Sequence, residues 1–317
     1  MKLDKVNNPK HFIDINKINS MQLKKIVDVA KKLKKEKFSK NFSDLLKHKN
    51  IAMIFEKNST RTRVSFEVAI NQLGGNAIVM NKQDMQLGKE AIEDTAKVLS
   101  RYVNGIVIRS QSHQTITELA NNSSVSVING LSDFSHPCQI IASIQAIEEN
   151  IGSISKKKLA WFGDQNNVLN SYVQAAKIFD YELNIASPKE LDFSKDEILK
   201  AIKSGAKINQ FNNAKDAAKN ADVLITDTWI SMGESAEKNQ KLKEEKIKQL
   251  LPFQVNLDLF KLANKKAIFT HCLPAYRGFE VSKEVMDSEK SIVFEEAENR
   301  LHAQKSILIW LFSNNDY

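Results

Sequence analysis

Short runs of β-branched and aromatic residues alternate with longer amphipathic stretches along almost the whole chain. This alternation constrains the fold most, because strands separated by helices build parallel sheets with helices on both faces. The sequence therefore predicts an α/β fold with doubly wound parallel sheets. The eight strand candidates occupy residues 51–55, 76–80, 106–108 and 125–128 in the first half, and 158–162, 183–186, 223–226 and 267–270 in the second.

The length of the chain indicates two sheets rather than one. At 317 residues it suits two α/β domains of about 150 residues each, with a cleft between them. A helix-like stretch at 138–149 separates the two sets of strands, and the amphipathic run at 297–312 has no strand after it. We expect a first domain at 1–137, a second at 138–296, and a C-terminal helix at 297–317 that packs back on the first domain.

The composition is that of a globular protein outside the membrane. Hydrophobic residues make up 42% of the chain, and no apolar run approaches the roughly 18 residues that span a bilayer. Residues 1–14 lack the apolar core of a signal peptide and the Arg-rich pattern of a transit peptide. Cys138 and Cys272 lie far apart and in no CxxC motif. We therefore expect a cytoplasmic protein with free thiols and no membrane partner.

The net charge of +8 raises the possibility of a nucleic-acid partner. The lysines, however, are scattered along helical stretches such as 31–37 and 241–248 without interleaved aromatic residues, which favours a solvated surface over a nucleic-acid interface. Only six of the 46 cationic residues are arginine, and most of these six stand in motifs at strand ends. The planar, bidentate guanidinium is therefore needed at those places rather than charge alone.

A phosphate site is predicted directly after the strand at 51–55. The segment there is Ser59-Thr60-Arg61-Thr62-Arg63, followed by apolar residues at helical spacing and a Gly74-Gly75 stop. Hydroxyl groups and arginines thus lie at a helix N-terminus, where free N–H groups and the helix dipole favour an anion. The alternative is a capped helix with surface arginines.

Polar residues also follow the other strands, at the edge where open parallel sheets bind ligands. A His before Pro is by itself more typical of a turn, and the segment 163–167 lacks the G-x-G-x-x-G spacing of a dinucleotide site. Together, however, these residues indicate a phosphate site that faces a carboxylate, an amide and a thiol. They are Arg109 after 106–108, His136 to Gln139 after 125–128, Gly163 to Asn167 after 158–162, Asp227 after 223–226, and His271 with Cys272 after 267–270.

Five motifs in this order resemble the aspartate and ornithine transcarbamylase family, over about residues 50–310. The first two are similar to both branches of the family, and the third and fourth resemble the ornithine branch. The resemblance implies transfer of the carbamoyl group of carbamoyl phosphate to ornithine, which gives citrulline and phosphate. The motifs are STRTR at 59–63, HPCQ at 136–139, DTWISMG at 227–233, HCLPA at 271–275 and ENRLHAQK at 298–305.

The same resemblance implies roles for individual residues. Carbamoyl phosphate would contact Ser59, Thr60, Arg61, Thr62, Arg109, His136, Gln139, Cys272, the backbone of Leu273, and Arg300. Ornithine would contact Asn167, Asp227, Ser231 and Met232, with Asp227 on the α-ammonium group. Gln86 would reach carbamoyl phosphate in a neighbouring subunit, which implies a homotrimer.

The reaction itself assigns the catalytic groups. An amine attacks a planar carbonyl, so donors must face the oxygen on which negative charge develops. We expect Arg109, His136 and Thr62 to bind this oxyanion, and the family resemblance implies that Cys272 closes the site around the carbonyl. No organic cofactor is required. His271 beside Cys272 hints at zinc, but two cysteines and six histidines without ligand spacing favour a site with no metal.

Several points stay open at this stage. The family often has His at the position of Tyr276 and an acidic residue at that of Phe279. Arg63 suits an internal ion pair as well as phosphate, and preferring Asn167 over Asn166 rests on the resemblance. A protein that only binds a phosphorylated metabolite, and a transcarbamylase for putrescine or N-acylated ornithine, are the alternative functions. Asp227 favours ornithine, because it suits a free α-ammonium group, and biosynthesis of arginine is the expected role.

Overall fold

The computed structural model describes residues 9–35, 42–82, 90–230 and 240–313 of the chain. The chain forms two compact units. Unit 1 comprises Met1–Gln145 and Asn299–Tyr317, and unit 2 comprises Ala146–Glu298. Both crossings between the units lie inside helices, α5 (Pro137–Ile151) and α12 (Val293–Phe312). The boundaries expected from the sequence, 137/138 and 296/297, fall at the first turn of α5 and inside α12.

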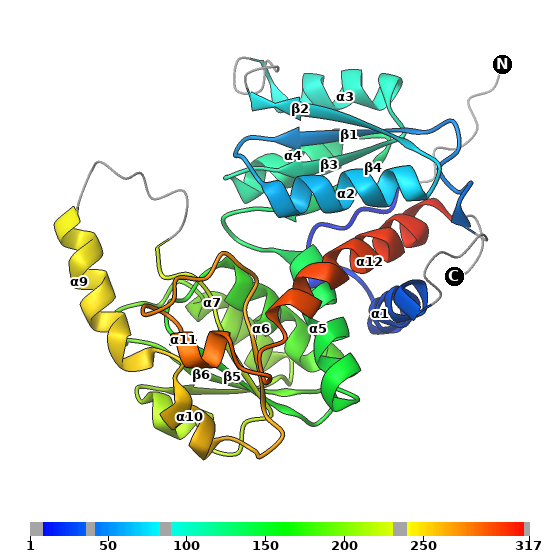
Figure 1. Cartoon of the computed structure of the whole chain (residues 1–317). Helices are drawn as coiled ribbons and strands as arrows, with labels where there is room; N and C mark the ends of the chain where they lie inside the picture. Colours follow the sequence, from blue (N-terminus) through cyan, green and yellow to red (C-terminus); the bar gives the residue numbers. More distant parts are fainter. Residues whose placement is uncertain (1–8, 36–41, 83–89, 231–239, 314–317) are drawn as a thin grey trace. The chain divides into compact units, whose positions relative to one another are not determined.

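Unit 1 contains a four-stranded parallel sheet with the strand order β2-β1-β3-β4 (Figure 1). The N-terminal segment runs beside β4, where Phe12 and Ile128 form a parallel bridge. The elements of this unit, besides α5 and α12, are a 3-10 helix (Ile15–Lys17), α1 (Ser20–Lys35), β1 (Asn50–Phe55), α2 (Thr60–Gln72), β2 (Asn76–Asn81), α3 (Ile92–Tyr102), β3 (Gly105–Arg109), α4 (His113–Asn122) and β4 (Ser126–Leu131).

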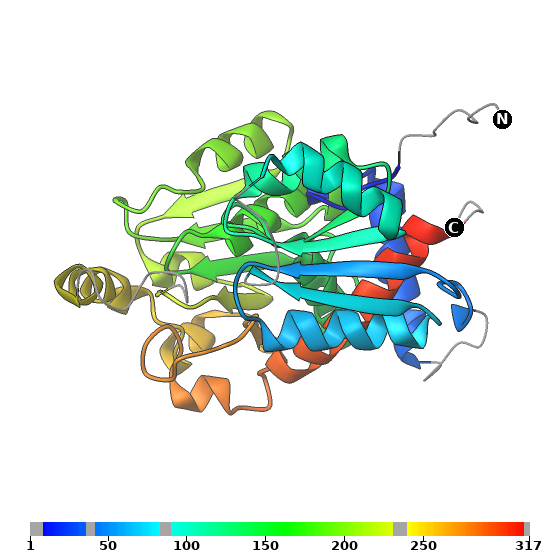
Figure 2. The ribbon, with the colours of Figure 1, turned by 90° about the horizontal axis from the view of Figure 1, so that it is seen from above.

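Helices cover both faces of this first sheet. Figure 2 shows α2 on one side of the sheet and α3 with α4 on the other. The core under α3 and α4 contains alternate residues of the strands, among them Ala52, Ile54 and Ile106, since successive side chains of a strand point to opposite faces. Gly74, at φ +82°, ends α2, as the Gly-Gly stop predicts.

Unit 2 contains a five-stranded parallel sheet with the order β7-β6-β5-β8-β9. The order reverses between β5 and β8, which is the position where such sheets bind ligands. The elements are β5 (Lys158–Phe162), α6 (Asn167–Phe179), β6 (Glu182–Ala186), α7 (Lys195–Lys203), β7 (Lys207–Phe211), α8 (Ala214–Ala218), β8 (Val223–Thr226), α9 (Gln240–Leu250), a 3-10 helix (Leu251–Phe253), α10 (Leu257–Leu262), β9 (Ile268–Thr270) and α11 (Lys283–Met286).

The second sheet is also buried on both faces. Residues of α8, α10 and α11 pack against Ala160, Phe162, Leu224 and Phe269 on one face. On the other face the ring of Trp161 lies 6.1 Å from that of Tyr172, which belongs to α6. Burial on both faces explains the continuous apolar runs of the strands.

The two parallel-sheet domains predicted from the sequence are confirmed. All eight predicted strands are present, with ends that differ by at most three residues. The structure adds β7, an edge strand with the sequence Lys-Ile-Asn-Gln-Phe and mostly exposed side chains. Such a polar strand has no apolar run to mark it, because an edge strand in this position buries few side chains.

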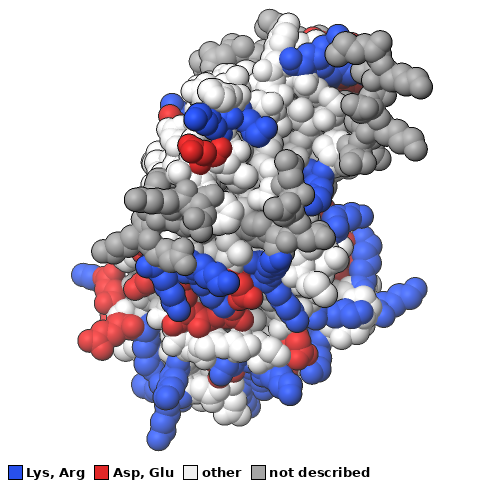
Figure 3. Space-filling view, turned by 90° about the vertical axis from the view of Figure 1, so that its right-hand side faces the viewer, with Lys and Arg blue, Asp and Glu red and all other residues white. Residues whose placement is uncertain are grey.

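Two features of the structure concern a membrane or nucleic-acid partner: the length and hydropathy of the helices, and the distribution of charged side chains. In the described ranges, none of the helices is both long and apolar enough to cross a membrane. On the face shown in Figure 3, Lys and Arg side chains lie in separate groups with Asp and Glu among them. This distribution is typical of solvated lysines.

Candidate active site

In unit 1, hydroxyl and guanidinium groups converge on the N-terminus of α2. Ser59 is the N-cap residue, and its Oγ accepts a hydrogen bond from the backbone N–H of Thr62 (3.3 Å). Nη1 of Arg109 donates to Oγ of Ser59 (3.0 Å) and to Oγ1 of Thr62 (3.4 Å). Nη2 of Arg300, from α12, donates to Oγ1 of Thr62 (2.6 Å). Two guanidinium groups thus lie against a helix N-terminus, an arrangement that favours an anion.

His136 is buried in the same unit, directly before α5. Burial, and then the positive charges of Arg300, Arg109 and Arg61, hold the pKa of His136 well below its usual value of 6.5. The imidazole is therefore neutral near pH 7, so it supplies a hydrogen-bonding group without a further positive charge. Gln139, in the first turn of α5, is also buried.

The edge of the first sheet holds Arg109 in place. Arg109 is the last residue of β3 and pairs with Phe55 of β1. The carboxylate of Glu56, the residue after Phe55, accepts hydrogen bonds from Ser110 Oγ (2.7 Å) and from the backbone N–H of Gln111 (2.8 Å). Glu56 thereby fixes the turn that follows Arg109.

Arg63 takes no part in this cluster. Its Nε lies 3.7 Å from Oε2 of Glu67, one helical turn later, and half of its side chain is exposed. The sequence left two interpretations of Arg63, an internal ion pair and a phosphate contact. The structure shows an ion pair, but it lies on the surface of α2 rather than in the interior.

In unit 2, an asparagine and an aspartate are joined at the ends of β5 and β8. Asn166 is the N-cap of α6, and its Oδ1 accepts hydrogen bonds from the backbone N–H groups of Val168 and Leu169. Its Nδ2 donates to Oδ2 of Asp227 (2.8 Å). The turn before it requires glycine at Gly163, which has φ +102° and would place any Cβ 2.5 Å from the indole of Trp229. The amide of Asn166 therefore orients a buried carboxylate.

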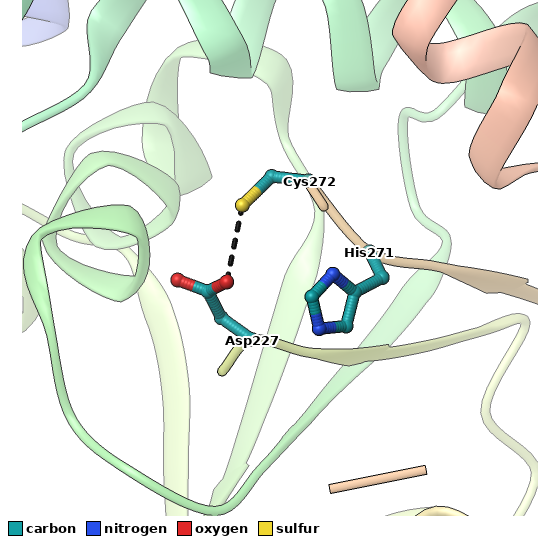
Figure 4. A group of neighbouring side chains, drawn as sticks. All are labelled: Asp227, His271 and Cys272. Carbon is teal, nitrogen blue, oxygen red and sulfur yellow. Dashed lines mark hydrogen bonds between the residues drawn. The ribbon is translucent and has the colours of Figure 1, made fainter. Parts of the chain in front are cut away.

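A thiol completes this second cluster. Sγ of Cys272 donates to Oδ1 of Asp227 (3.1 Å), and His271 stands beside the pair (Figure 4). The backbone N–H of Leu273 donates to Nδ1 of His271 (2.8 Å), and Nε2 of His271 lies 3.3 Å from Oε1 of Glu280. His271 and Glu280 are almost completely buried. They hold the backbone after Cys272, where Leu273 has φ +59°.

The ligand atoms of Asp227, His271 and Cys272 lie within 4.8 Å of one another, which meets the distance requirement of a metal site. The spacing in the sequence did not predict this grouping. Nδ1 of His271 accepts the backbone N–H of Leu273, whereas Nε2 lies 3.3 Å from Oε1 of Glu280 without forming a hydrogen bond to it. Binding of a metal through Nδ1 would require the ring to give up its hydrogen bond with Leu273.

Comparison with known families identifies the chain. Residues 10–149 match the family described as aspartate/ornithine carbamoyltransferase, carbamoyl-P binding domain, and residues 155–311 match its Asp/Orn binding domain. The ornithine carbamoyltransferase of Rhodopseudomonas palustris is 48% identical over 308 residues, which cover 96% of this chain and 97% of that protein. The chain belongs to the aspartate/ornithine carbamoyltransferase family.

Solved structures of carbamoyltransferases have the same fold. The ornithine carbamoyltransferase from Pyrococcus furiosus superposes with a TM-score of 0.89 at 41% identity, covering 97% of this chain and 98% of that one. The anabolic ornithine carbamoyltransferase from Campylobacter jejuni has a TM-score of 0.86 at 40% identity, covering 95% and 98%. The chain is therefore a carbamoyltransferase.

The carbamoyltransferase structure brings the predicted residues into two groups. Ser59, Thr60, Arg61, Thr62, Arg109, His136, Gln139 and Arg300 belong to unit 1, and Asn167, Asp227, Cys272 and Leu273 belong to unit 2. Gln86, Ser231 and Met232 lie outside the described residues. The backbone N–H of Leu273 donates to Nδ1 of His271.

The sequence did not point to two supporting residues of this carbamoyltransferase: Glu56, which orients the turn after Arg109, and Glu280, which faces His271. Asn166, which the sequence analysis placed second to Asn167, is the residue that orients Asp227. A signal existed for Asn166, because an Asn at the start of a predicted helix is a good N-cap. Glu56 and Glu280 make contacts that depend on the tertiary fold, and acidic residues in loops give no such signal.

Proposed function

We propose that this carbamoyltransferase transfers the carbamoyl group of carbamoyl phosphate to the side-chain amine of L-ornithine. The observation that carries this proposal is the carboxylate of Asp227, buried at the end of β8 and oriented by Asn166 and Cys272. A buried carboxylate with fixed geometry suits an α-ammonium group. The relatives named ornithine carbamoyltransferase support the same acceptor.

Unit 1 is the proposed site of carbamoyl phosphate. The N-terminus of α2, with Ser59, Thr60 and Arg61, binds the phosphate group, since a helix N-terminus and a guanidinium both favour a multiply charged anion. Arg109, Thr62 and His136 donate hydrogen bonds to the carbonyl oxygen, which becomes negative when the amine adds. Gln139 and Arg300 complete the contacts of the substrate.

The acceptor amine has to lose a proton before it attacks. A free alkylamine has a pKa of about 10.4, so near pH 7 it is almost wholly protonated. The concentration of positive charge around Arg109 and Arg300 disfavours an ammonium group, and the departing phosphate accepts a proton. The C–N bond forms as the tetrahedral intermediate appears, and the bond between carbon and the phosphate oxygen then breaks.

The test is a side-by-side assay of the carbamoylated products formed with ornithine, putrescine, N-acetylornithine and aspartate as acceptors. We expect ornithine to give the highest kcat/KM, because N-acetylornithine lacks the free α-ammonium group, putrescine lacks the α-carboxylate, and aspartate lacks the side-chain amine. Faster reaction of putrescine or N-acetylornithine would favour the alternative, a sister transcarbamylase in which Asp227 binds no α-ammonium group.

We assign the enzyme to the biosynthesis of arginine in the cytoplasm. The similarity to the anabolic ornithine carbamoyltransferase from Campylobacter jejuni supports a biosynthetic role, and the free thiols of Cys138 and Cys272 suit a reducing compartment. Expression in an arginine auxotroph that lacks its own ornithine carbamoyltransferase should restore growth without arginine. Failure to grow despite measurable activity in extracts would count against a biosynthetic role.

We also propose a homotrimer in which Gln86 of one subunit completes the site of the next. In a closed ring, a Gln86→Ala chain and an Asp227→Ala chain are each inactive but can complement each other. Random mixing should leave roughly a quarter of the sites intact. Activity of the tagged, mixed oligomers that does not exceed the sum of the parents would mean that Gln86 acts within its own subunit or not at all.

A further inference from the structure

A closed ring of polar side chains lies beside His136 and has no part in the proposed chemistry. Nε2 of His113 lies 3.2 Å from Oδ2 of Asp14, and Nδ1 of His113 lies 2.9 Å from Oγ of Ser132. Oγ of Ser132 accepts a hydrogen bond from the backbone N–H of Ser135 (3.0 Å). Oγ of Ser135 donates to Oδ1 of Asp14 (2.6 Å), which closes the ring.

The ring joins three segments that are far apart in the sequence. Asp14 belongs to the N-terminal segment beside β4, and His113 is the first residue of α4. Ser132 and Ser135 belong to the loop between β4 and α5, and the residue after Ser135 is His136. All of these residues lie in unit 1. Asp14, Ser132 and Ser135 are buried, so the contacts are shielded from water.

The geometry fixes the direction of the hydrogen bonds. A carboxylate only accepts, so Nε2 of His113 carries a proton toward Asp14. In the neutral ring Nδ1 is then the acceptor, and the hydroxyl of Ser132 donates to it. If Nδ1 also carries a proton, the hydroxyl of Ser132 can turn to the carbonyl oxygen of Ser135, 3.3 Å away. The loop is held in either state.

Ser, His and Asp in a chain resemble a hydrolytic triad, but the arrangement does not suit a nucleophile. Ser132 is completely buried, and its Oγ accepts hydrogen bonds from the backbone N–H groups of Phe134 and Ser135. These bonds lower the nucleophilicity of the oxygen, and burial keeps a substrate away from it. The ring is thus built to hold its own backbone.

Further contacts tie the same loop to α4 and β4. Oδ1 of Asp133 accepts the backbone N–H of His113 (2.9 Å), and the ring of Phe134 packs on the imidazole at 4.9 Å. Nδ2 of Asn129 donates to Oγ of Ser135 (3.0 Å). The loop is therefore fixed from both sides up to the residue before His136, whereas the described contacts of the ring do not include Ser59 to Thr62.

We propose that Asp14, His113, Ser132 and Ser135 form a positioning ring that sets the placement of His136 for carbamoyl transfer. This inference rests on the role of His136 in the proposed function. Loss of the ring should lower kcat and leave the binding of phosphate at α2 unchanged. A small misplacement of a catalytic donor reduces its stabilisation of the transition state more than its stabilisation of the ground state.

The experiment is a double-mutant cycle with two matched measurements. His113→Ala and His136→Gln are made singly and together, and kcat for citrulline formation is measured with the dissociation constant of inorganic phosphate from calorimetry. We expect His113→Ala to lower kcat about 10- to 100-fold and to leave phosphate binding unchanged. In the His136→Gln background, His113→Ala should cause little further loss, since the group that it positions is already absent.

The control is Ser123→Ala, which removes a buried hydroxyl of the same unit from the turn before β4. It should lower the melting temperature without changing kcat. If His113→Ala does not fold, His113→Asn keeps a polar atom near the position of Nδ1 and should retain part of the activity. An equal loss in both backgrounds, or no loss at all, would overturn the positioning role. A wild-type protein that forms no citrulline would instead overturn the proposed function.

Discussion

The two clusters of this protein are built on the same plan and carry opposite chemistry. Each lies at the carboxyl ends of parallel strands, with a helix that begins in the cluster: α2 after β1 in unit 1, and α6 after β5 in unit 2. In unit 1 the groups at this edge are hydroxyls and the guanidiniums of Arg109 and Arg300. In unit 2 they are the carboxylate of Asp227, an amide and a thiol.

The comparison shows that the fold determines where a binding site lies, whereas the side chains at that place determine whether it binds an anion or a cation. At α2 the helix dipole and the arginines act in the same direction, toward an anion. At α6 the dipole also favours negative charge, but the protein itself provides that charge as Asp227, which is hydrogen-bonded to the N-cap residue Asn166. The second cluster therefore suits a cationic group of the substrate, and the first suits an anionic one.

The largest expected effect is the loss of kcat in Arg109→Lys, in unit 1. This change keeps the charge but shortens the side chain and removes the planar guanidinium, whose Nη1 donates to both Ser59 and Thr62. We expect kcat to fall about 10²- to 10³-fold, as for the loss of one oxyanion donor. Arg101→Lys, at an exposed arginine of α3, is the control and should have normal kcat. Near-normal turnover of folded Arg109→Lys would remove Arg109 from the oxyanion site.

The matching change in unit 2 is Asp227→Asn. It preserves the shape of the side chain and removes the charge that binds the α-ammonium group. We expect the KM of ornithine to rise about 100-fold, since breaking one buried charge pair costs about 3 kcal/mol. The KM of carbamoyl phosphate should change little, and Asp216→Asn, on the surface of α8, should change neither. An equal rise in the KM of both substrates would contradict the assignment of ornithine to the cluster of unit 2 and of carbamoyl phosphate to the cluster of unit 1.

Asn166→Ala sharpens the comparison, because this residue both caps α6 and orients Asp227. Loss of the cap should reduce the free energy of unfolding by about 1 kcal/mol. Asn213→Ala removes the equivalent cap of α8, which is remote from Asp227, and should give a similar shift in melting temperature. Only Asn166→Ala should also raise the KM of ornithine, by about tenfold for a lost hydrogen bond to a charged group. An unchanged KM would limit Asn166 to capping.

The pH dependence of stability tests whether burial, together with the nearby arginines, keeps His136 neutral in unit 1. The pKa of His136 is held well below 6.5 in the folded protein, whereas the unfolded chain titrates near 6.5. Between these two values the unfolded chain binds more protons. The stability is thus complete above pH 6.5 and declines as the pH falls, by up to about 1.4 kcal/mol per pH unit from this residue.

Denaturant unfolding from pH 7.5 to 5 measures this decline. His136→Gln should flatten it, and His48→Asn, at an exposed histidine, should not. A decline that is identical in all three proteins would mean that the pKa of His136 is the same in the folded and unfolded chain, contrary to its burial near three arginines.

The sequence predicted those features that depend on local pattern. Strand runs, the helix start in the Ser59-to-Arg63 segment and the stop at Gly74 are encoded by residues close together, so both sheets and the edges that carry the clusters followed from them. The polar edge strand β7 lacked such a pattern. The contact of Arg300 with Thr62 joins residues 238 positions apart, and only the resemblance to a family pointed to it.

The same limit explains the missed supporting residues. Glu56 contacts a turn 55 residues later, and Asp14 closes a ring with Ser135, 121 residues away. Such partners are chosen by strand order and loop geometry, which a single sequence does not state. Asn166 and Asn167 are adjacent and chemically equal, and only the start of α6 decides which of them is the cap.

The smallest expected effect concerns Arg63, two residues after Arg61 in the same motif. Its guanidinium pairs with Glu67 along the exposed side of α2, and both side chains are substantially solvated. Such pairs contribute about 0.3 to 0.5 kcal/mol, which solvent and salt reduce further. Arg63→Gln should therefore shift the melting temperature very little and leave kcat and both KM values unchanged, whereas Arg61→Lys should lower kcat by orders of magnitude although it keeps the charge. Measuring both variants in the same assay distinguishes the two arginines. A large loss in Arg63→Gln would extend the anion site along the helix and show that net positive charge, rather than the directed contacts at the first turn of α2, defines the cluster of unit 1.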